Sequence, residues 1–319
     1  MKKPKALITG IAGFAGSHLA LELLGNNYEL FGTVLYGESL ANIQDIKKNV
    51  NLSRLNITNS SKVQTLIMKI RPDFIFHLAA FSSVGQSFAN EELTYRSNIL
   101  GSLNLLKANL HNRNLKKFIF ISSSDCYGPQ KNSRLAIKET AHLNPVSPYA
   151  ISKAAAESIC TYYYTHKKLP VIISRSFNHS GPKQSMNFVI PSFARQIAAI
   201  DKGKAKPIMK VGDLSPRRDF SDVRDIVRGY RQMAEKGKKG EIYNLSSNKA
   251  VSIEKVLDIL LSFSGKKIKV IRDKKRVRKD DIPLLRGNNT KAVQEIGYEA
   301  RYSLKTTLKD TLNYWREKV

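Results

Sequence analysis

The chain has 319 residues and an ordinary hydrophobic fraction of 42%, but its formal net charge is +27. The composition excludes an intrinsically disordered protein, and the longest apolar runs are far shorter than the roughly 20 residues that cross a bilayer, so we expect a soluble protein with no membrane partner. Because lysine and arginine are spread along the whole chain, we interpret the charge as a solvated basic surface and not as a specific nucleic-acid site.

The cysteines and the N-terminus bear on where the protein works. Cys126 and Cys160 are too few for a disulfide scaffold in a chain of this length, and the first residues lack the apolar segment of a secretory signal. We therefore expect a cytoplasmic protein with two reduced, structural thiols.

The first half of the chain alternates short apolar runs with segments of helical period, which is typical of a parallel sheet covered by helices on both faces. We predict strands over residues 5–9, 29–35, 52–56, 74–79, 117–122 and 170–175, helices over 16–25 and 93–109, and a helix that carries Tyr149 and Lys153 and runs to about residue 166. Beyond residue 176, prolines separate shorter elements, with a helix at 222–236 and a strand at 241–244. The pattern predicts a doubly wound, Rossmann-type α/β fold in which residues 1–176 with 219–247 form one domain and residues 177–218 with 248–319 form a smaller, interleaved C-terminal domain.

A glycine-rich loop, Gly10 to Gly16, joins the first predicted strand to the first predicted helix. Glycines at 10, 13 and 16 permit a tight turn and a close backbone approach, and the helix N-terminus offers free amides to a pyrophosphate. This position in the fold favours dinucleotide binding over an ordinary strand-to-helix turn.

The end of the second predicted strand bears on the choice of dinucleotide. An acidic residue there normally accepts from the 2′-hydroxyl of NAD, and the run from Thr33 to Gly37 offers none. We therefore predict NADP(H) in preference to NAD(H). Arg54 or a nearby lysine could reach a 2′-phosphate, although a solvated surface role suits them equally.

Tyr149 and Lys153 stand four residues apart on a predicted helix, which places both side chains on one face. A nearby ammonium favours a phenolate, so we expect Lys153 to draw the pKa of Tyr149 down from about 10 toward the working range. Such a pair predicts proton exchange with a carbonyl or hydroxyl group.

Several motifs across the chain resemble those of the extended short-chain dehydrogenases/reductases that act on nucleotide sugars. They are Gly10-x-x-Gly13-x-x-Gly16, His77-Leu78-Ala79-Ala80, Asn98, Ser122-Ser123-Ser124, Tyr149-x-x-x-Lys153, Arg175 to His179, Arg217 to Val223, and Arg278 with Asp280 to Pro283. Residues 178–184 and 188–230 are most similar to the branch of that family that reduces GDP-4-keto-6-deoxy-D-mannose.

The resemblance implies a role for each matching residue. Ser123, Tyr149 and Lys153 would be catalytic, and Asp125 stands where 4,6-dehydratases usually carry a glutamate. The implied cofactor-binding residues are Gly10, Gly13, Phe14, Ala15, Gly16, Asn56, Ile57, Leu78, Ala79, Ala80, Asn98, Tyr149 and Lys153. The implied substrate-binding residues are Ser82, Ser83, Val84, Asn178, Val189, Lys210, Val211, Gly212, Arg218, Arg278 and Asp281. His77 and His179 would be positioned by hydrogen bonds and would not be catalytic.

The resemblance also implies a dinucleotide-binding first domain, a nucleotide-sugar-binding second domain, a homodimer, and NADPH-dependent reduction of the C4 keto group of a nucleotide-linked 4-keto-6-deoxy sugar. The expected reaction converts GDP-4-keto-6-deoxy-D-mannose to GDP-D-rhamnose. A nucleotide-sugar 4,6-dehydratase, a 4-epimerase with recycled NAD(P), and a nucleotide-responsive binding protein stay open as alternatives. No histidine, cysteine and acid spacing suits zinc, so we expect no metal.

Overall fold

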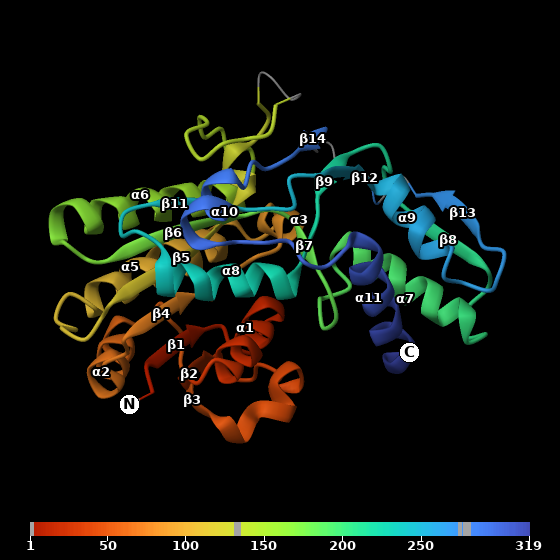
Figure 1. Ribbon diagram of the computed structural model, residues 1–319. Coiled ribbons are helices and arrows are strands. Elements are labelled where there is room, and N and C mark those ends of the chain that lie inside the picture. Colours follow the sequence, from red (N-terminus) through yellow and green to blue (C-terminus); the bar gives the residue numbers. More distant parts are fainter. Residues whose placement is uncertain (1–2, 131–134, 274–275, 277–281) are drawn as a thin grey trace.

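The computed structural model describes residues 3–130, 135–273, 276 and 282–319 (Figure 1). Two predicted substrate-binding residues, Arg278 and Asp281, lie outside the described residues. Within those ranges, no helix combines the length and apolar character needed to cross a bilayer.

Seven parallel strands form the central sheet, in the order β11-β6-β5-β4-β1-β2-β3 (Figure 1). They are β1 (Lys5–Thr9), β2 (Glu29–Val34), β3 (Val50–Arg54), β4 (Phe74–His77), β5 (Lys117–Ser123), β6 (Val171–Ser176) and β11 (Ile242–Leu245). The strand predictions are confirmed, with ends that differ by at most two residues. The chain adds β2 and β3 on one side of β1 and then β4 on its other side, so the strand order reverses between β1 and β4. A sheet of this kind binds ligands at the carboxyl ends of its strands near that point.

Helices cover both faces of the sheet, which explains why the strands are apolar on both sides. On one face lie α1 (Phe14–Gly25), α8 (Val223–Lys236) and α10 (Thr290–Ile296), and on the other lie α2 (Ser60–Ile70), α5 (Gly101–Ala108) and α6 (Pro148–Lys167). In β1, Ala6 and Ile8 pack into the first layer and Leu7 packs into the second. The doubly wound fold is confirmed.

The single helix predicted over 93–109 is divided in the structure. It consists of α4 (Glu91–Tyr95), a π-helical turn η2 (Arg96–Leu100) and α5. Asn98 lies in the π turn, where its side-chain oxygen accepts from Phe81 N at 2.8 Å and its amide donates to Ser152 Oγ at 2.8 Å. Such turns often accompany functional sites, and this one aims a side chain at two neighbouring segments.

A second hydrophobic cluster lies beside the sheet, at the right of Figure 1. It is built from α7 (Val189–Asp201), β8 (Ile208–Val211), α9 (Ile253–Leu261) and α11 (Leu304–Lys318), and β13 (Lys269–Arg272) pairs with β8. A small sheet, β12 (Ala250–Ser252), β9 (Arg217–Asp219) and β14 (Leu284–Leu285), adjoins it. The chain returns to the main sheet through α8 between these pieces. The domain boundaries given above stay a prediction.

The shorter elements complete the chain. They are η1 (Ala41–Asn49), α3 (Val84–Ser87), η3 (Ser124–Tyr127), β7 (His179–Ser180) and β10 (Ser221–Asp222). Asp222 joins the two bodies, because it pairs with Arg224 of α8, which also pairs with Asp310 of α11 at 2.8 Å.

Candidate active site

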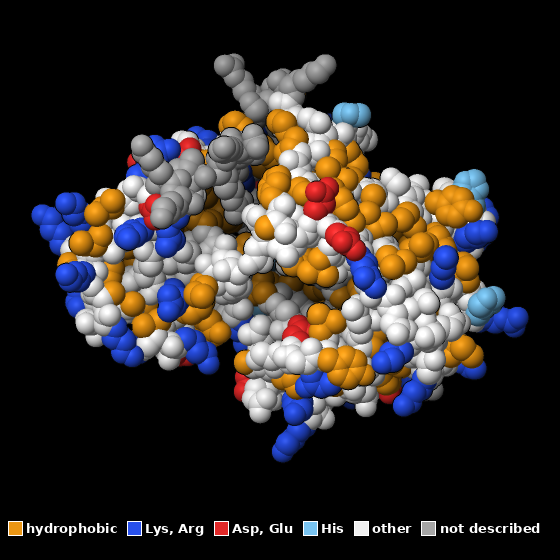
Figure 2. Space-filling view, turned by 180° about the vertical axis from the view of Figure 1, so that it is seen from behind, with side chains coloured by type: hydrophobic (Ala, Val, Ile, Leu, Met, Phe, Trp, Pro, Cys, Tyr) orange, Lys and Arg blue, Asp and Glu red, His pale blue; other side chains and the backbone are white. Residues whose placement is uncertain are grey.

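A cavity of about 1360 Å³ opens along the carboxyl ends of β1, β2, β4, β5 and β6. Figure 2 shows a hollow between the two lobes with hydrophobic side chains in it, and lysine and arginine scattered over both lobes of this face. The volume exceeds the roughly 300 to 1,000 Å³ of sites for a single drug-sized ligand, so two extended ligands can share it.

The glycine-rich loop forms one end of the cavity. Gly10 has a φ of +71°, and a Cβ there would lie 3.0 Å from Ala79 Cα. A Cβ on Gly16 would collide with the Gly10 carbonyl oxygen. Gly13 is the N-cap of α1 and has no side-chain acceptor, so the first-turn amides of Phe14 and Ala15 remain for a ligand at the cavity wall. The geometry fits the pyrophosphate of a dinucleotide.

His77 holds the segment after β4 through a chain of buried hydrogen bonds. Ala79 N donates to Thr9 Oγ1 at 3.1 Å, and Thr9 Oγ1 lies 2.8 Å from His77 Nδ1. On the other ring nitrogen, Nε2 lies 2.9 Å from Ser102 Oγ, which itself donates to Asn98 O. These partners assign a neutral Nε2–H ring. Burial, followed by the charge of Lys153, lowers the pKa of His77 to about 3.

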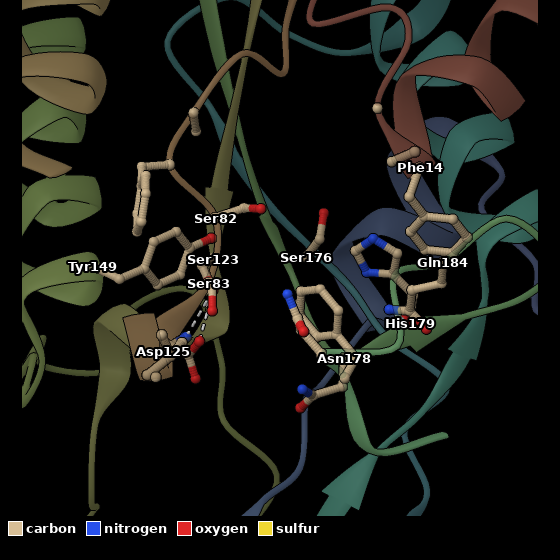
Figure 3. Close-up of a pocket in the computed structure, with 18 of the residues that line it drawn as sticks. Phe14, Ser82, Ser83, Ser123, Asp125, Tyr149, Ser176, Asn178, His179 and Gln184 are labelled. Atoms are coloured by element: carbon tan, nitrogen blue, oxygen red, sulfur yellow. Dashed lines mark hydrogen bonds between the residues drawn. The ribbon is translucent and has the colours of Figure 1, made fainter. Parts of the chain in front are cut away.

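His179 is likewise positioned and neutral. Its Nδ1 donates to Phe177 O at 2.9 Å, and its ring stacks on Phe14 with centroids 5.9 Å apart (Figure 3). Burial lowers its pKa. The prediction that His77 and His179 are held by hydrogen bonds is confirmed.

The carboxyl end of β2 differs from the sequence expectation. No carboxylate stands in the run from Thr33 to Gly37, but the chain turns back after it, and Glu38 Oε2 accepts from Leu35 N at 2.8 Å. Glu38 lines the cavity. The expectation of a strand end without an acid was therefore wrong, because a turn of four residues restores one there.

Ser123, Tyr149 and Asp125 gather at the end of β5 and the start of α6 (Figure 3). Ser123 Oγ accepts from Asp125 N at 3.2 Å and donates to Asp125 Oδ2 at 3.3 Å. The N-cap Ser147 and the first-turn Pro148 start α6 directly before Tyr149, which fixes the phenol at the cavity wall. In Figure 3 these groups face Phe14 and His179 across the cavity, with Asn178 between them.

The pKa of Tyr149 departs from the expectation. Burial first, and then the Asp125 carboxylate, raise it well above its ordinary value, while a hydrogen bond from Ser123 opposes the shift. Lys153 does not supply the expected effect, because its Nζ donates to Ile121 O at 2.7 Å and lies over the Phe120 ring. Burial lowers the pKa of Lys153 to about 8. The surroundings of Tyr149 in this structure therefore favour the neutral phenol over the phenolate.

A buried ion pair that the sequence did not reveal lies next to Ser123, at the end of β5. Arg175 Nη2 lies 2.7 Å from Glu157 Oε2, and both side chains are almost fully buried. Glu157 also accepts from Ser122 Oγ, next to Ser123, and Arg175 Nη1 donates to Tyr127 OH at 3.1 Å. In the sequence, Glu157 stands four residues after Lys153, which places it on the same helix face. That spacing does not reveal its partner Arg175, because the contact between α6 and β6 depends on the fold.

The structure brings most of the predicted ligand-binding residues to the cavity wall. These are Gly10, Gly13, Phe14, Ala15, Gly16, Asn56, Ile57, Leu78, Ala79, Ala80, Ser82, Ser83, Asn178, Val189 and Arg218. Asn98 is not at the wall, and it acts through Phe81 and Ser152. The Oδ1 atom of Asn178 is buried with no hydrogen-bond partner among the described residues, which suits a ligand donor.

Lys210 is not among the residues that line the cavity. Its backbone N–H donates to Gln196 Oε1 at 3.0 Å and its carbonyl oxygen accepts from Gln196 Nε2 at 3.3 Å, so its main chain is occupied by α7. The other two residues of this expected segment, Val211 and Gly212, do line the cavity.

Among the described residues, three arginines line the cavity: Arg218, which was predicted, and Arg195 and Arg276, which were not. Asp219 fixes the strand that carries Arg218, because it accepts from Ser247 N at 2.8 Å and from Gly287 N at 3.2 Å. Guanidinium groups in this number suit a diphosphate. Val84, which was expected to contact the sugar, belongs to an apolar wall whose other members were missed; they are Phe81, Phe88, Val146, Met186 and Phe188.

In the described parts of the chain, no group of three or more histidine, cysteine, aspartate or glutamate side chains is placed to hold a metal ion. The parallel sheet has a glycine-rich loop after its first strand and Ser123, Tyr149 and Lys153 at its carboxyl edge. These features define the class of protein, the extended short-chain dehydrogenases/reductases.

Comparisons with known proteins narrow this class. The family model for GDP-mannose 4,6 dehydratase matches residues 7–311. The chain belongs to that family, whose relatives are NAD(P)-dependent enzymes of nucleotide-sugar metabolism.

Individual relatives agree with the family. The GDP-6-deoxy-D-mannose reductase of Pseudomonas aeruginosa is 34% identical over 248 residues, which cover 78% of this chain and 82% of that protein. The structure of RMD from Pseudomonas aeruginosa complexed with NADPH has a TM-score of 0.86 at 29% identity and covers 99% of this chain and 100% of its own. UDP-glucose 4-epimerase from Thermus thermophilus complexed with NAD has a TM-score of 0.87 at 26% identity, with coverage of 99% and 100%.

Proposed function

We propose that this protein reduces the C4 keto group of a nucleotide-linked 4-keto-6-deoxy sugar, with GDP-4-keto-6-deoxy-D-mannose as substrate, GDP-D-rhamnose as product and NADPH as the preferred donor. The observation that carries the proposal is the Tyr149 phenol, which hydrogen-bonds with Ser123 at the wall of a cavity with room for two nucleotides. The similarity to a GDP-6-deoxy-D-mannose reductase, and to a structure that holds NADPH, supports the choice of substrate and donor.

The chain's own groups account for the proton and for orientation. When bound, NADPH would supply the hydride for C4. Tyr149 donates its phenolic proton to the C4 oxygen as negative charge develops there, and the Ser123 hydroxyl stabilises the same oxygen. Lys153 donates from its Nζ to Ile121 O, and it would offer its ammonium to a ribose hydroxyl of the cofactor.

The substrate would bind on the opposite side of the cavity, within the smaller C-terminal domain. Arg195, Arg218 and Arg276 supply positive charge for its diphosphate, and the apolar wall suits a C6 methyl group better than a C6 hydroxyl. Asn178 offers an unpaired carbonyl oxygen to a sugar hydroxyl.

The test is a coupled absorbance assay in which NADPH loss is followed with purified GDP-4-keto-6-deoxy-D-mannose. We expect one NADPH consumed per sugar reduced, and chromatography should show GDP-D-rhamnose. If no 4-keto-6-deoxy sugar nucleotide consumes NADPH or NADH, the proposal is wrong.

A 4,6-dehydratase is the second candidate, and a specific observation supports it: Asp125 brings a carboxylate to Ser123 and Tyr149. Dehydration needs such an additional acid or base. A dehydratase, like a 4-epimerase, would recycle its cofactor, so it would convert GDP-mannose or a UDP-hexose without added NADPH. Asp125→Asn should abolish dehydration while it leaves ketone reduction measurable.

A homodimer is the proposed assembly, and a reducing cytoplasm the proposed setting. Large hydrophobic side chains are exposed on the segment from η2 to α6, namely Leu100, Ile151 and Tyr162. Burial of exposed side chains of this kind favours self-association. Cys126 and Cys160 are buried free thiols, which suits reducing conditions. Light scattering at micromolar concentration would give the assembly directly.

A further inference from the structure

The segment of residues 178–184, which carries Asn178, is anchored outside the cavity to the cofactor side of the molecule. Lys183 Nζ donates to Asn42 O at 2.7 Å, across 141 positions of the chain. Asn42 lies in η1, and its own Nδ2 donates to Ala12 O at 3.0 Å. Since Ala12 belongs to the glycine-rich loop, two side-chain hydrogen bonds in series connect residues 178–184 with that loop.

A second connection joins the same segment to α1. His18 donates from Nε2 to Pro182 O at 2.9 Å, since a carbonyl oxygen can only accept. The His18 ring packs edge-on against Phe14, with centroids 5.6 Å apart, and Phe14 stacks on His179 (Figure 3). The segment therefore contacts the first two turns of α1, where the proposed cofactor would place its pyrophosphate.

Hydrogen bonds within residues 179–184 make this segment one unit. Gln184 Nε2 donates to His179 O at 3.0 Å, and Gln184 Oε1 accepts from Ser180 Oγ at 2.6 Å. Lys183 has a φ of +73°, a backbone conformation that residues other than glycine rarely adopt and that persists where surrounding contacts hold it. A change at the Lys183 anchor is therefore transmitted to the start of the segment, which lines the cavity.

Lys183, Asn42 and His18 are not among the described residues that line the cavity, so they act through the segment and not on a ligand. We propose that Lys183 is a positioning residue that couples the two ligands: it holds the segment of Asn178 against the glycine-rich loop, so that a bound dinucleotide strengthens the binding of the sugar nucleotide.

The coupling has a physical reason. A dinucleotide on the glycine-rich loop fixes the Ala12 end of the connection, and the sugar nucleotide then binds a segment that is already ordered. Coupling of this kind is reciprocal, so the sugar nucleotide strengthens dinucleotide binding by the same factor. The inference rests on the proposed function for the identity of the two ligands, but it can be tested without turnover.

Titration calorimetry of the full chain with GDP-mannose, without and with saturating NADPH, measures the coupling. GDP-mannose has no keto group to reduce and NADPH cannot oxidise it, so binding is measured without reaction. We expect NADPH to lower the dissociation constant of GDP-mannose about 5- to 20-fold in the wild type and less than about twofold in Lys183→Met. Methionine keeps an aliphatic stem at this position but has no ammonium to donate to Asn42 O.

Two further variants test the route of the coupling. Asn42→Ala removes the bond to Ala12 but keeps the Asn42 carbonyl oxygen, and it should lose the effect of NADPH as well. Lys168→Met is the matched control, because Lys168 at the end of α6 also has a positive φ, +56°, and donates from Nζ to a main-chain oxygen, Thr165 O, at 2.9 Å. It should keep the full effect of NADPH.

A lysine that only stabilises the fold would weaken GDP-mannose binding by one common factor without and with NADPH. A full effect of NADPH in Lys183→Met would therefore overturn the inference, and so would a wild type that does not bind GDP-mannose or binds it equally well without NADPH. If the coupling is lost as expected but no keto sugar is reduced, the inference stands and the proposed function fails. Thermal melting of each variant confirms that the comparison is made on folded protein.

Discussion

The two sides of the cavity are built in different ways. The proposed cofactor and catalytic side consists of strand ends and helix starts of one sheet, where Thr9, His77, Asn98 and Lys153 are buried and bonded to one another's segments. The proposed substrate side includes partly or fully exposed arginines on separate elements, α7, β9 and the segment after β13. The first side is held by buried hydrogen bonds, whereas the charges of the second stand on side chains that are open to solvent.

Removal of the phenol should give the largest effect. Tyr149→Phe deletes the proposed proton donor while its ring still fills the buried site, so we expect kcat to fall by about 10² to 10⁴. The dissociation constant of NADPH should stay within about twofold, because the phenol is not the main contact of the cofactor. Tyr162→Phe, on an exposed face of the same helix, is the matched control and should keep full activity. Near-normal turnover in Tyr149→Phe would remove the phenol from the mechanism.

Loss of the buried ion pair between Arg175 and Glu157 should have the next largest effect, a loss of stability. Arg175→Met leaves Glu157 buried without its partner and should lower the free energy of unfolding by about 3 to 5 kcal/mol. Arg231→Met breaks pairs with Glu22 and Glu235 that are partly open to water and should cost only about 0 to 1 kcal/mol. Denaturant unfolding of both variants measures the two free energies of unfolding. If both fall by the same amount, the buried pair stabilises the fold no more than the partly exposed pairs do.

A change on the substrate side should affect binding alone. Arg218→Gln removes a charge-assisted contact of about 1.5 to 3 kcal/mol, so KM for the sugar nucleotide should rise about 10- to 100-fold with little change in kcat. Its neighbour Arg217 donates to Ala250 O and does not line the cavity, so Arg217→Gln should leave KM unchanged. A fall in kcat with constant KM in Arg218→Gln would place this arginine at the chemistry instead.

The last prediction concerns pH and tests whether the buried His77 ring stays neutral. The folded-state pKa of His77 is about 3 and the ordinary value is 6.5, so the unfolded chain binds more protons between these limits. The contribution of His77 is therefore complete above about pH 6.5 and is lost as pH falls, by at most about 1.4 kcal/mol per pH unit. His77→Asn should flatten the acid limb of the stability profile, whereas replacement of the exposed His111 by Asn should not. An unchanged limb in His77→Asn would show that the ring is not kept neutral.

The sequence was sufficient for the strands of the first half and for the glycine loop, because both follow from local periodicity and from the backbone freedom of Gly10. It also located Ser123, Tyr149 and Lys153, through their resemblance to a family whose fold places them together. It could not give Glu38, whose place at the end of β2 depends on a turn, nor the pairing of Glu157 with Arg175 across α6 and β6.

The pair Tyr149 and Lys153 shows which properties follow from the sequence and which depend on the tertiary structure. Their spacing by itself determined that both side chains share a helix face near the site. Only the tertiary structure decided the direction of their pKa shifts, because burial raises the pKa of the phenol and lowers that of Lys153, whose Nζ donates to Ile121 O. Helical spacing is local and can be read from the chain, whereas desolvation and the nearest partner depend on which segments fold against that face.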